Sequence, residues 1–294
     1  MNQSGCSTNS QVVWPKLVDH YILVQGDALL TLAESQGDSA TKQLPDTNDK
    51  APPAEDRQEW FERLELMLKT EQLQLFLQPV VSCQHPGHIL HHKVLARVED
   101  LQGNSIVAGK FLPWIHRFGW SRQLDEIMFN KVFHWLQRHD GTLALSLSAE
   151  TVLNLSLLNE MLSPLKSLPN IARRLILELD EHRLPDSEHF KKLNDLIGFY
   201  GCGIGIQHFG GRFDLIGNIA QWGLSYLKVD GRYIREIDKE SDKQVFIQAL
   251  YRATNSIALP LIAERVETAE ELATLSAISI QGAMGLLVGE PSKS

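Results

Sequence analysis

Short apolar runs alternate with amphipathic stretches over most of the chain. The runs lie at 73–81, 88–98, 143–147, 175–179, 204–209, 226–229, 261–263 and 285–288. Helical spacing of apolar residues occurs at 55–70, 111–118 and 124–136, and between most of the later runs. Short apolar runs bounded by turn residues are typical of buried strands. Strands separated by helices predict a (β/α)8 barrel, although an open doubly wound sheet fits the periodicity almost as well.

The pattern changes near the N-terminus. Residues 1–39 hold one stretch with helical spacing, 21–32, followed by a helix stop at Gly37 and Asp38. Residues 40–54 are rich in Pro, Asp, Thr and Asn and have almost no large apolar side chains, which is linker composition. We therefore predict an N-terminal segment at 1–39, a linker at 40–54 and a barrel domain at 55–294.

Composition narrows the class of protein. The 294 residues are 43% hydrophobic and carry a net charge of −8, which argues against a general nucleic-acid or anionic-membrane surface. Cys6, Cys83 and Cys202 are few and widely spaced, so we interpret them as free thiols in a reducing compartment. No apolar run approaches the roughly 20 residues of a membrane span, and residues 1–10 are too polar for a signal peptide. We expect a soluble, cytoplasmic chain.

Two apolar runs end in charged residues. One closes with Lys228 and Asp230, and the other leads into Glu264 and Glu267. In a parallel barrel the C-terminal ends of the strands form the functional rim, so we expect a site there. The two segments resemble the LKID and AEGVET motifs of the EAL domain, the cyclic-di-GMP phosphodiesterase family.

Other segments follow the motif order of that family. Residues 78–81 resemble QPI, 93–97 lies at E-A-L-x-R, 146–148 at N-x-S, 178–181 at E-x-T-E, 207–210 at D-D-F-G, and 284–286 with Pro291 at Q-G-Y and its closing proline. The resemblance spans roughly 60–294. It implies a modified TIM barrel, the EAL fold, whose first strand is antiparallel to the others.

The resemblance also shows departures at the metal ligands. Family enzymes hold two divalent cations with acidic residues and one asparagine, because hard cations need oxygen ligands. Here Lys93 stands at the signature glutamate, Ser146 at the asparagine, and Gln207 and His208 at an aspartate pair. We expect no metal, no cofactor and no meaningful hydrolysis. We also expect the Lys93 ammonium to neutralise Glu178 and Asp230 in place of metal.

The ligand-binding positions are better matched. The resemblance places these residues at or near cyclic-di-GMP: Gln78, Leu95, Arg97, Glu178, Phe209, Lys228, Asp230, Glu264, Glu267 and Pro291. Arg97 matches an arginine that faces a phosphate, since a guanidinium fork can hold two phosphate oxygens. The alternative for Arg97 is a salt bridge to Glu99 or Asp100. Met284 and Leu286 replace the polar and aromatic residues of Q-G-Y, which alters part of the pocket wall.

Several segments resemble degenerate GGDEF–EAL receptors of the LapD type, namely 93–97, 209–218 and 226–234. Residues 26–37 resemble the last helix of a GGDEF domain. The resemblance implies a catalytically inactive cyclic-di-GMP receptor, expected to be a homodimer. Such a receptor transmits the second-messenger level to a protein partner in a membrane-associated system that controls adhesion and biofilm. The alternatives are a protein-interaction module that no longer binds nucleotide and a residual phosphodiesterase.

Three further features have ordinary structural interpretations. His85, His88, His91 and His92 crowd one predicted hairpin, but their spacing fits no defined metal pattern, so we interpret them as surface histidines. The glycine-rich segment 201–205 precedes a predicted strand and is typical of a tight turn. The acidic pair at 270–271 suits the first turn of a helix, where the helix dipole favours negative charge.

Overall fold

The protein forms one mixed sheet that closes into a barrel. The structure is a computed structural model that describes residues 54–99, 103–212 and 219–294. Its strands are β1 (Gln74–Ser82), β2 (Ile89–Glu99), β3 (Ser105–Val107), β4 (Leu143–Ser146), β5 (Leu175–Asp180), β6 (Gly203–Phe209), β7 (Tyr226–Val229), β8 (Leu261–Ala263), β9 (Gly282–Ala283) and β10 (Ser292–Lys293). The order is β10-β1-β9-β8-β7-β6-β5-β4-β2-β3, and an additional β1–β2 pairing closes the ring. The predicted barrel is confirmed.

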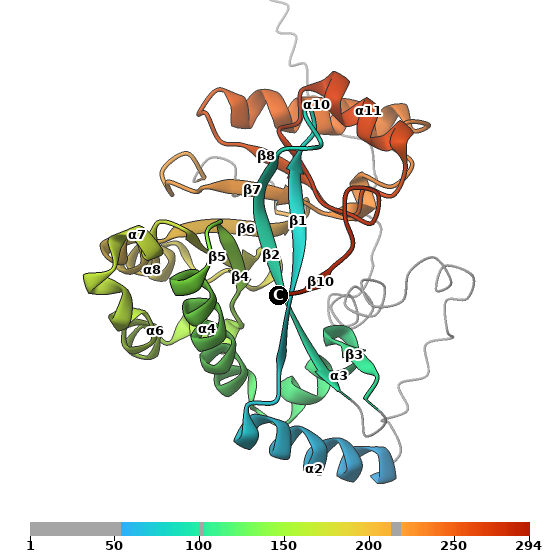
Figure 1. The fold of residues 1–294 in the computed structure, drawn as a ribbon. Helices are drawn as coiled ribbons and strands as arrows, with labels where there is room; N and C mark the ends of the chain where they lie inside the picture. The colour runs from blue at the N-terminus through green and yellow to red at the C-terminus, as the bar shows by residue number, and fades with distance from the viewer. Residues whose placement is uncertain (1–53, 100–102, 213–218) are drawn as a thin grey trace, which may run out of the picture.

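Helices alternate with the parallel strands and pack around them (Figure 1). The longer ones are α2 (Ala54–Thr70), α3 (Ala108–Arg117), α4 (Ser121–Arg138), α6 (Leu155–Leu162), α8 (Ser187–Tyr200), α10 (Ser241–Asn255) and α11 (Ala269–Ile278). Short helical segments are α5 (Ala149–Leu153), α7 (Pro169–Ala172), η2 (Ser163–Ser167), η3 (Glu181–Arg183) and η5 (Gly231–Tyr233). Fully buried side chains such as Phe111, Phe129 and Phe190 fill the space between these helices and the barrel. No helix within the described ranges is long and apolar enough to cross a membrane.

The first two strands depart from the parallel pattern. β1 and β2 form an antiparallel hairpin in which Gln74 pairs with Arg97 and Val80 with His91. From β2 onward, β4 to β9 follow in parallel, and β9 returns to pair antiparallel with β1. Figure 1 shows the hairpin as the two long neighbouring strands that cross the centre of the view. The predicted antiparallel first strand is confirmed.

Several helices begin or end at residues that favour a helix terminus. Gly201 ends α8 with a φ of 80°, in the left-handed region that glycine adopts easily, and β6 begins two residues later. Thr268 and Glu271 form a capping box at the start of α11, so the acidic first turn is confirmed. The predicted N-terminal segment 1–39 and all of the predicted linker 40–54 except Ala54, which begins α2, lie outside the described residues.

The predicted strand at 285–288 is wrong. The last barrel strand is β9, and the chain leaves the sheet after it. Gly285 is pressed against another backbone, because a Cβ atom there would lie 2.1 Å from the carbonyl oxygen of Val266. Leu286 and Leu287, which suggested a buried strand, are 50% and 41% exposed. The sequence also gave no signal for β3 and β10, which are two or three residues long.

The buried carboxylate of Asp125 joins α4 to the start of α5. It accepts hydrogen bonds from the backbone N–H of Ser148 at 2.9 Å and from its hydroxyl at 2.6 Å, just before α5. Burial raises the pKa of Asp125 to about 6, despite these bonds. This is above the value of about 3.9 for an unfolded chain. The protonated form therefore favours folding, and that stabilisation is lost as the pH rises through about 6.

We expect Asp125→Asn to remove this pH dependence. Between about pH 4 and pH 7 the natural protein should lose on the order of 1–3 kcal/mol of unfolding free energy relative to the variant. Urea unfolding at several pH values measures the difference, in which other titrating groups cancel. Parallel pH profiles for the two proteins would contradict the assignment.

Candidate functional site

The side chains inside the barrel lie in layers, because each strand directs every second residue inward. Alternate residues of each strand point inward, so side chains two apart lie at successive levels. One level holds His91, Ile176, Tyr226 and Ile262, and the next holds the polar residues Lys93, Ser146, Glu178, Gln207 and Lys228. Gly205 makes room for Tyr226, since a Cβ atom there would lie 2.4 Å from its ring. The sequence therefore delivers a polar cluster to the middle of an apolar barrel.

Lys93 lies at the centre of this polar cluster. Its ammonium donates to the hydroxyl of Ser146, to Oε2 of Glu178 and, at 2.7 Å, to Oε1 of Gln207. Ser146 also donates to Gln207 at 3.1 Å. Ser146 and Gln207 are thus bonded to Lys93, and Lys93 is bonded to Glu178. The expected pairing of Lys93 with Glu178 is confirmed.

Lys228 and Tyr226 contact the other carboxylate oxygen of Glu178. Lys228 Nζ lies 2.5 Å from Glu178 Oε1, and both side chains are fully buried. Tyr226 donates its hydroxyl to the same oxygen at 2.7 Å. Lys228 Nζ also lies 3.9 Å from the sulfur of Met284. Lys93, Glu178, Lys228 and Tyr226 form one continuous network, which we call the lysine–glutamate cluster.

Charge and burial oppose each other in this cluster. Burial alone would raise the pKa of Glu178, but the Lys228 and Lys93 ammonium groups outweigh it and hold the pKa well below its usual range. Burial lowers the pKa of Lys228, with Glu178 opposing the shift. Burial and the neighbouring Glu178 carboxylate raise the pKa of Tyr226, so its hydroxyl remains a donor. The cluster thus holds the Glu178 carboxylate between the side-chain amino groups of two lysines.

His208 forms a separate acidic contact at the end of β6. Its Nδ1 lies 2.9 Å from Asp180 Oδ2, and its Nε2 lies 3.7 Å from Glu264 Oε2. The residue has a φ of 56°, in the left-handed region, which turns its ring toward the two carboxylates. Glu181 holds the following loop, because its carboxylate accepts from the backbone N–H groups of residues 210–212. His208 is therefore in contact with Asp180 and Glu264, and Glu264 also acts electrostatically on Lys228 of the lysine–glutamate cluster.

The expected pairing of Lys93 with Asp230 is wrong. Asp230 accepts from the backbone N–H of Arg232 at 2.8 Å, where it begins η5, and from the Arg232 guanidinium at 3.1 Å. A side chain directly after a strand is drawn into capping the next helical turn, which the strand pattern does not reveal. Glu267 lies apart from the cluster as well, with its carboxylate 3.8 Å from the Arg235 guanidinium.

The remaining expected ligand positions lie around the cluster without bonding to it. Arg97 is half-buried with its guanidinium over the Phe76 ring, 5.2 Å from the centroid, and burial lowers its pKa. Among described residues no ion pair joins Arg97 to Glu99, which accepts from Gln74 instead; Asp100 lies outside them. Gln78 donates to the Gly289 carbonyl at 3.2 Å. Leu95 and Pro291 are partly exposed, whereas Phe209 is fully buried in the core. Their contact with nucleotide stays a prediction.

Tyr226, Asp180 and Arg232 complete these contacts but were not among the predicted site residues. Tyr226 lies two positions before Lys228 on the same strand, so the inward period of two would have found it. Asp180 lies two positions after Glu178 in the same way. Arg232 gave no signal, because its pairing with Asp230 depends on the turn after β7. His91 is also misassigned as a surface residue, since it is only 4% exposed; His85 and His88 are exposed as expected.

The side chains of the lysine–glutamate cluster do not suit the binding of a divalent cation. Both oxygens of Glu178 already accept from ammonium groups, and a cation placed beside them would meet the positive charges of Lys93 and Lys228. Across 54–99, 103–212 and 219–294, no group of three or more His, Cys, Asp and Glu side chains is placed to hold a metal ion. Chemically, the arrangement offers lysine amino groups as hydrogen-bond donors beneath the rim.

Comparison with known proteins defines the class. The sequence profile of the EAL domain matches residues 61–291, so the chain belongs to the EAL domain family. It is 25% identical over 279 residues to the bifunctional diguanylate cyclase/cyclic di-GMP phosphodiesterase MucR of Pseudomonas aeruginosa, covering 92% of this chain and 40% of MucR. It is 23% identical over 225 residues to the probable cyclic di-GMP phosphodiesterase PdeA of Escherichia coli, covering 74% of this chain and 30% of PdeA. The chain thus spans less than half the length of these relatives.

Solved structures share the fold. The PaMucR phosphodiesterase in complex with c-di-GMP superposes with a TM-score of 0.71 at 26% identity, covering 79% of this chain and 97% of that one. The S helix–GGDEF–EAL segment of Vibrio cholerae LapD without ligand gives a TM-score of 0.72 at 20% identity, covering 82% of this chain and 59% of that one. The likeness to LapD establishes the fold alone.

Proposed function

We propose that this chain binds cyclic-di-GMP without hydrolysing it and reports the ligand to a protein partner. One observation carries the proposal: the Lys93 ammonium is bonded to Glu178, Ser146 and Gln207 in the middle of the barrel. The family resemblance puts metal ligands at these positions. The Glu178 carboxylate, held on both oxygens by lysine amino groups, is poorly placed to bind a catalytic cation.

The rim supplies groups that suit a phosphodiester. Arg97 on β2 carries a guanidinium that stacks on Phe76 and is partly open to solvent. A guanidinium can donate two parallel hydrogen bonds to phosphate oxygens. Below it, the lysine–glutamate cluster places two lysine amino groups beside the Glu178 carboxylate, and Glu264 acts electrostatically on Lys228 as well. The PaMucR complex, 26% identical to this chain, supports cyclic-di-GMP as the ligand.

Ligand binding would have to change the conformation or the assembly of the chain in order to reach a protein partner. A receptor works only if the ligand binds one conformation or assembly more tightly than another. The LapD-like segments support a homodimer within an inner-membrane adhesion system, with this chain on the cytoplasmic side.

We expect Arg97→Ala to weaken cyclic-di-GMP binding about 10- to 100-fold, because a charge-assisted phosphate contact contributes roughly 1.5–3 kcal/mol. Calorimetric titration in the presence of a chelator measures the change. Arg122→Ala on α4 is the matched control, since Arg122 pairs with Glu126 in the same helix and its loss should leave affinity unchanged. Equal affinity of the Arg97 variant and the natural protein would refute the assignment of Arg97.

A protein-interaction module that has lost nucleotide binding is the second candidate. Leu286 and Leu287 favour it, because they are 50% and 41% exposed near the rim where the family motif has an aromatic residue. The same titration separates the two candidates. No heat and no thermal shift with cyclic-di-GMP would favour the interaction module over the receptor.

A further inference from the structure

A pocket lies at the end of the barrel opposite the rim. Its volume is about 750 Å³, and eleven side chains line it. Several of them start strands or end the antiparallel one: Tyr226 begins β7, Gln281 precedes β9, and Ser82 ends β1. The rim residues Asp230 and Glu264 instead follow their strands. The pocket is therefore distinct from the surface proposed for cyclic-di-GMP.

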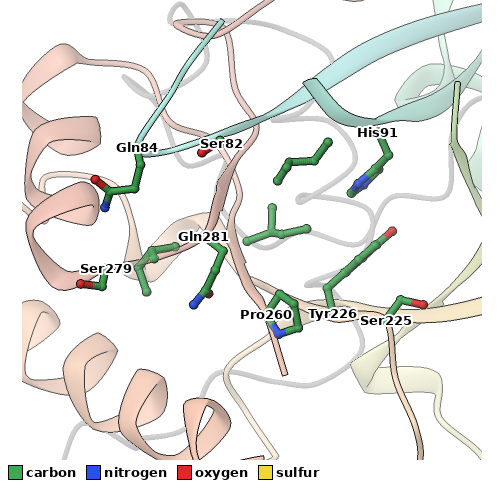
Figure 2. A pocket seen from close by; sticks show the side chains of 11 residues that line it. Ser82, Gln84, His91, Ser225, Tyr226, Pro260, Ser279 and Gln281 are labelled. Atoms are coloured by element: carbon green, nitrogen blue, oxygen red, sulfur yellow. The ribbon is translucent and has the colours of Figure 1, made fainter. Parts of the chain in front are cut away.

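His91 is the unusual residue of this pocket. It is 4% exposed, and its ring stacks on Tyr226 with 4.8 Å between the centroids and 6° between the planes. Its Nε2 is buried and has no hydrogen-bond partner among the described residues. A buried polar atom without a partner costs roughly 1–3 kcal/mol, so a retained one calls for an explanation. Figure 2 shows the imidazole nitrogens directed toward the group of lining residues rather than away from it.

The lining favours an uncharged ligand. Burial and the nearby Lys228 lower the pKa of His91 to about 3, so its imidazole is neutral at physiological pH. The other lining side chains are uncharged: Leu90, Pro260, Ile262 and Ile280 are apolar, and Ser82, Gln84, Ser225, Tyr226, Ser279 and Gln281 are polar. The Tyr226 hydroxyl donates to Glu178 at 2.7 Å. Its ring therefore offers the pocket a flat apolar face.

We propose that this pocket binds a small uncharged aromatic molecule whose hydroxyl or N–H group hydrogen-bonds to the imidazole of His91. The stacked rings of His91 and Tyr226 provide an aromatic wall, and the apolar residues provide the burial that binds such a molecule. A neutral imidazole has one donor and one acceptor nitrogen, so a hydroxyl suits either tautomer. The site is independent of cyclic-di-GMP and of the proposed function.

Phenol and toluene are matched probes, because they have nearly the same shape and differ in a hydroxyl. We expect phenol to shift the imidazole 15N resonance of His91 in histidine-labelled protein, with the resonance assigned by its loss in His91→Phe. We expect phenol to bind at least about tenfold more tightly than toluene, which corresponds to one hydrogen bond of about 1.4 kcal/mol.

The variants separate the pocket from the nearby hairpin. His91→Phe keeps an aromatic ring but removes both nitrogens, so phenol affinity should fall to that of toluene. His88→Phe changes an exposed histidine of the same hairpin that does not line the pocket, and it should bind phenol like the natural protein. An unmoved His91 resonance, equal binding of the two probes to the natural protein, or no binding of phenol at millimolar concentration would overturn the proposal. The resonance and the probe pair decide the matter even if His91→Phe fails to fold.

Discussion

Glu178→Gln is expected to lower the unfolding free energy by about 3–5 kcal/mol, the cost of breaking a buried ion pair from one side. Glu178 is fully buried, and its two oxygens accept from Lys93, Lys228 and Tyr226. A neutral glutamine would leave two ammonium groups close together without a carboxylate. Urea unfolding at neutral pH, followed by circular dichroism, measures the loss.

Glu188→Gln is the matched control for this change. Glu188 pairs with Lys192 one helical turn away, and both side chains are largely exposed. Exposed pairs of this kind contribute little to stability, so we expect a change within about 0.5 kcal/mol. If Glu178→Gln were no more destabilising than Glu188→Gln, the lysine–glutamate cluster would not be the structural centre described above.

Gly285→Ala is expected to destabilise the protein by about 3 kcal/mol, at the upper end of the cost of overpacking. The added Cβ would lie 2.1 Å from the carbonyl oxygen and 2.3 Å from the nitrogen of Val266. Both atoms belong to the backbone, which cannot move aside like the end of a flexible side chain. The segments after β8 and β9 would have to separate, which would open the rim near Leu286.

Gly87→Ala isolates the steric cause of that loss. A Cβ at Gly87 would meet no atom within 4 Å, and the residue is not in the left-handed region. We expect its unfolding midpoint in urea to stay near that of the natural protein, within about 0.5 kcal/mol. A similar small change for Gly285→Ala would show that the two segments are not held together as tightly as the structure indicates.

The alternation of strands and helices could be predicted because the buried strands are nearly continuous apolar runs. The closed barrel, as opposed to an open sheet, was favoured by the family resemblance. The strand at 226–229 was predicted with its exact limits, as was the one at 261–263. The apolar run at 285–288 misled the prediction, since its leucines face solvent and its glycine packs on a neighbouring backbone. Whether an apolar run is buried depends on tertiary contacts, which periodicity alone does not contain.

The candidate site was predictable where strands alone position the side chains. Lys93 and Glu178 both point into the barrel, so their pairing followed from the motif alignment. Asp230 sits one residue beyond its strand, and the local turn directs it to Arg232 instead. His91 was misassigned because its exposed neighbours in the hairpin suggested a surface, although it lies two residues before Lys93 on the inward face of β2.

The lysine–glutamate cluster explains how a barrel of this family can keep its shape with different charges inside it. A lone buried carboxylate is costly, and a divalent cation is one way to compensate it. Here two lysines compensate Glu178 with hydrogen-bonded contacts that the chain itself supplies. The interior is thereby held together by residues of the fold, and the receptor that we propose needs no cation to bind its ligand at the rim.

The most direct measurement follows cyclic-di-GMP in contact with the purified protein, first with a chelator and then with magnesium or manganese. Calorimetry gives the affinity, and chromatography of the recovered nucleotide shows whether it has been cleaved. We predict binding of intact ligand with the same affinity in both conditions. Appearance of the linear dinucleotide over many turnovers when metal is added would show that the chain is a phosphodiesterase and contradict the proposed receptor.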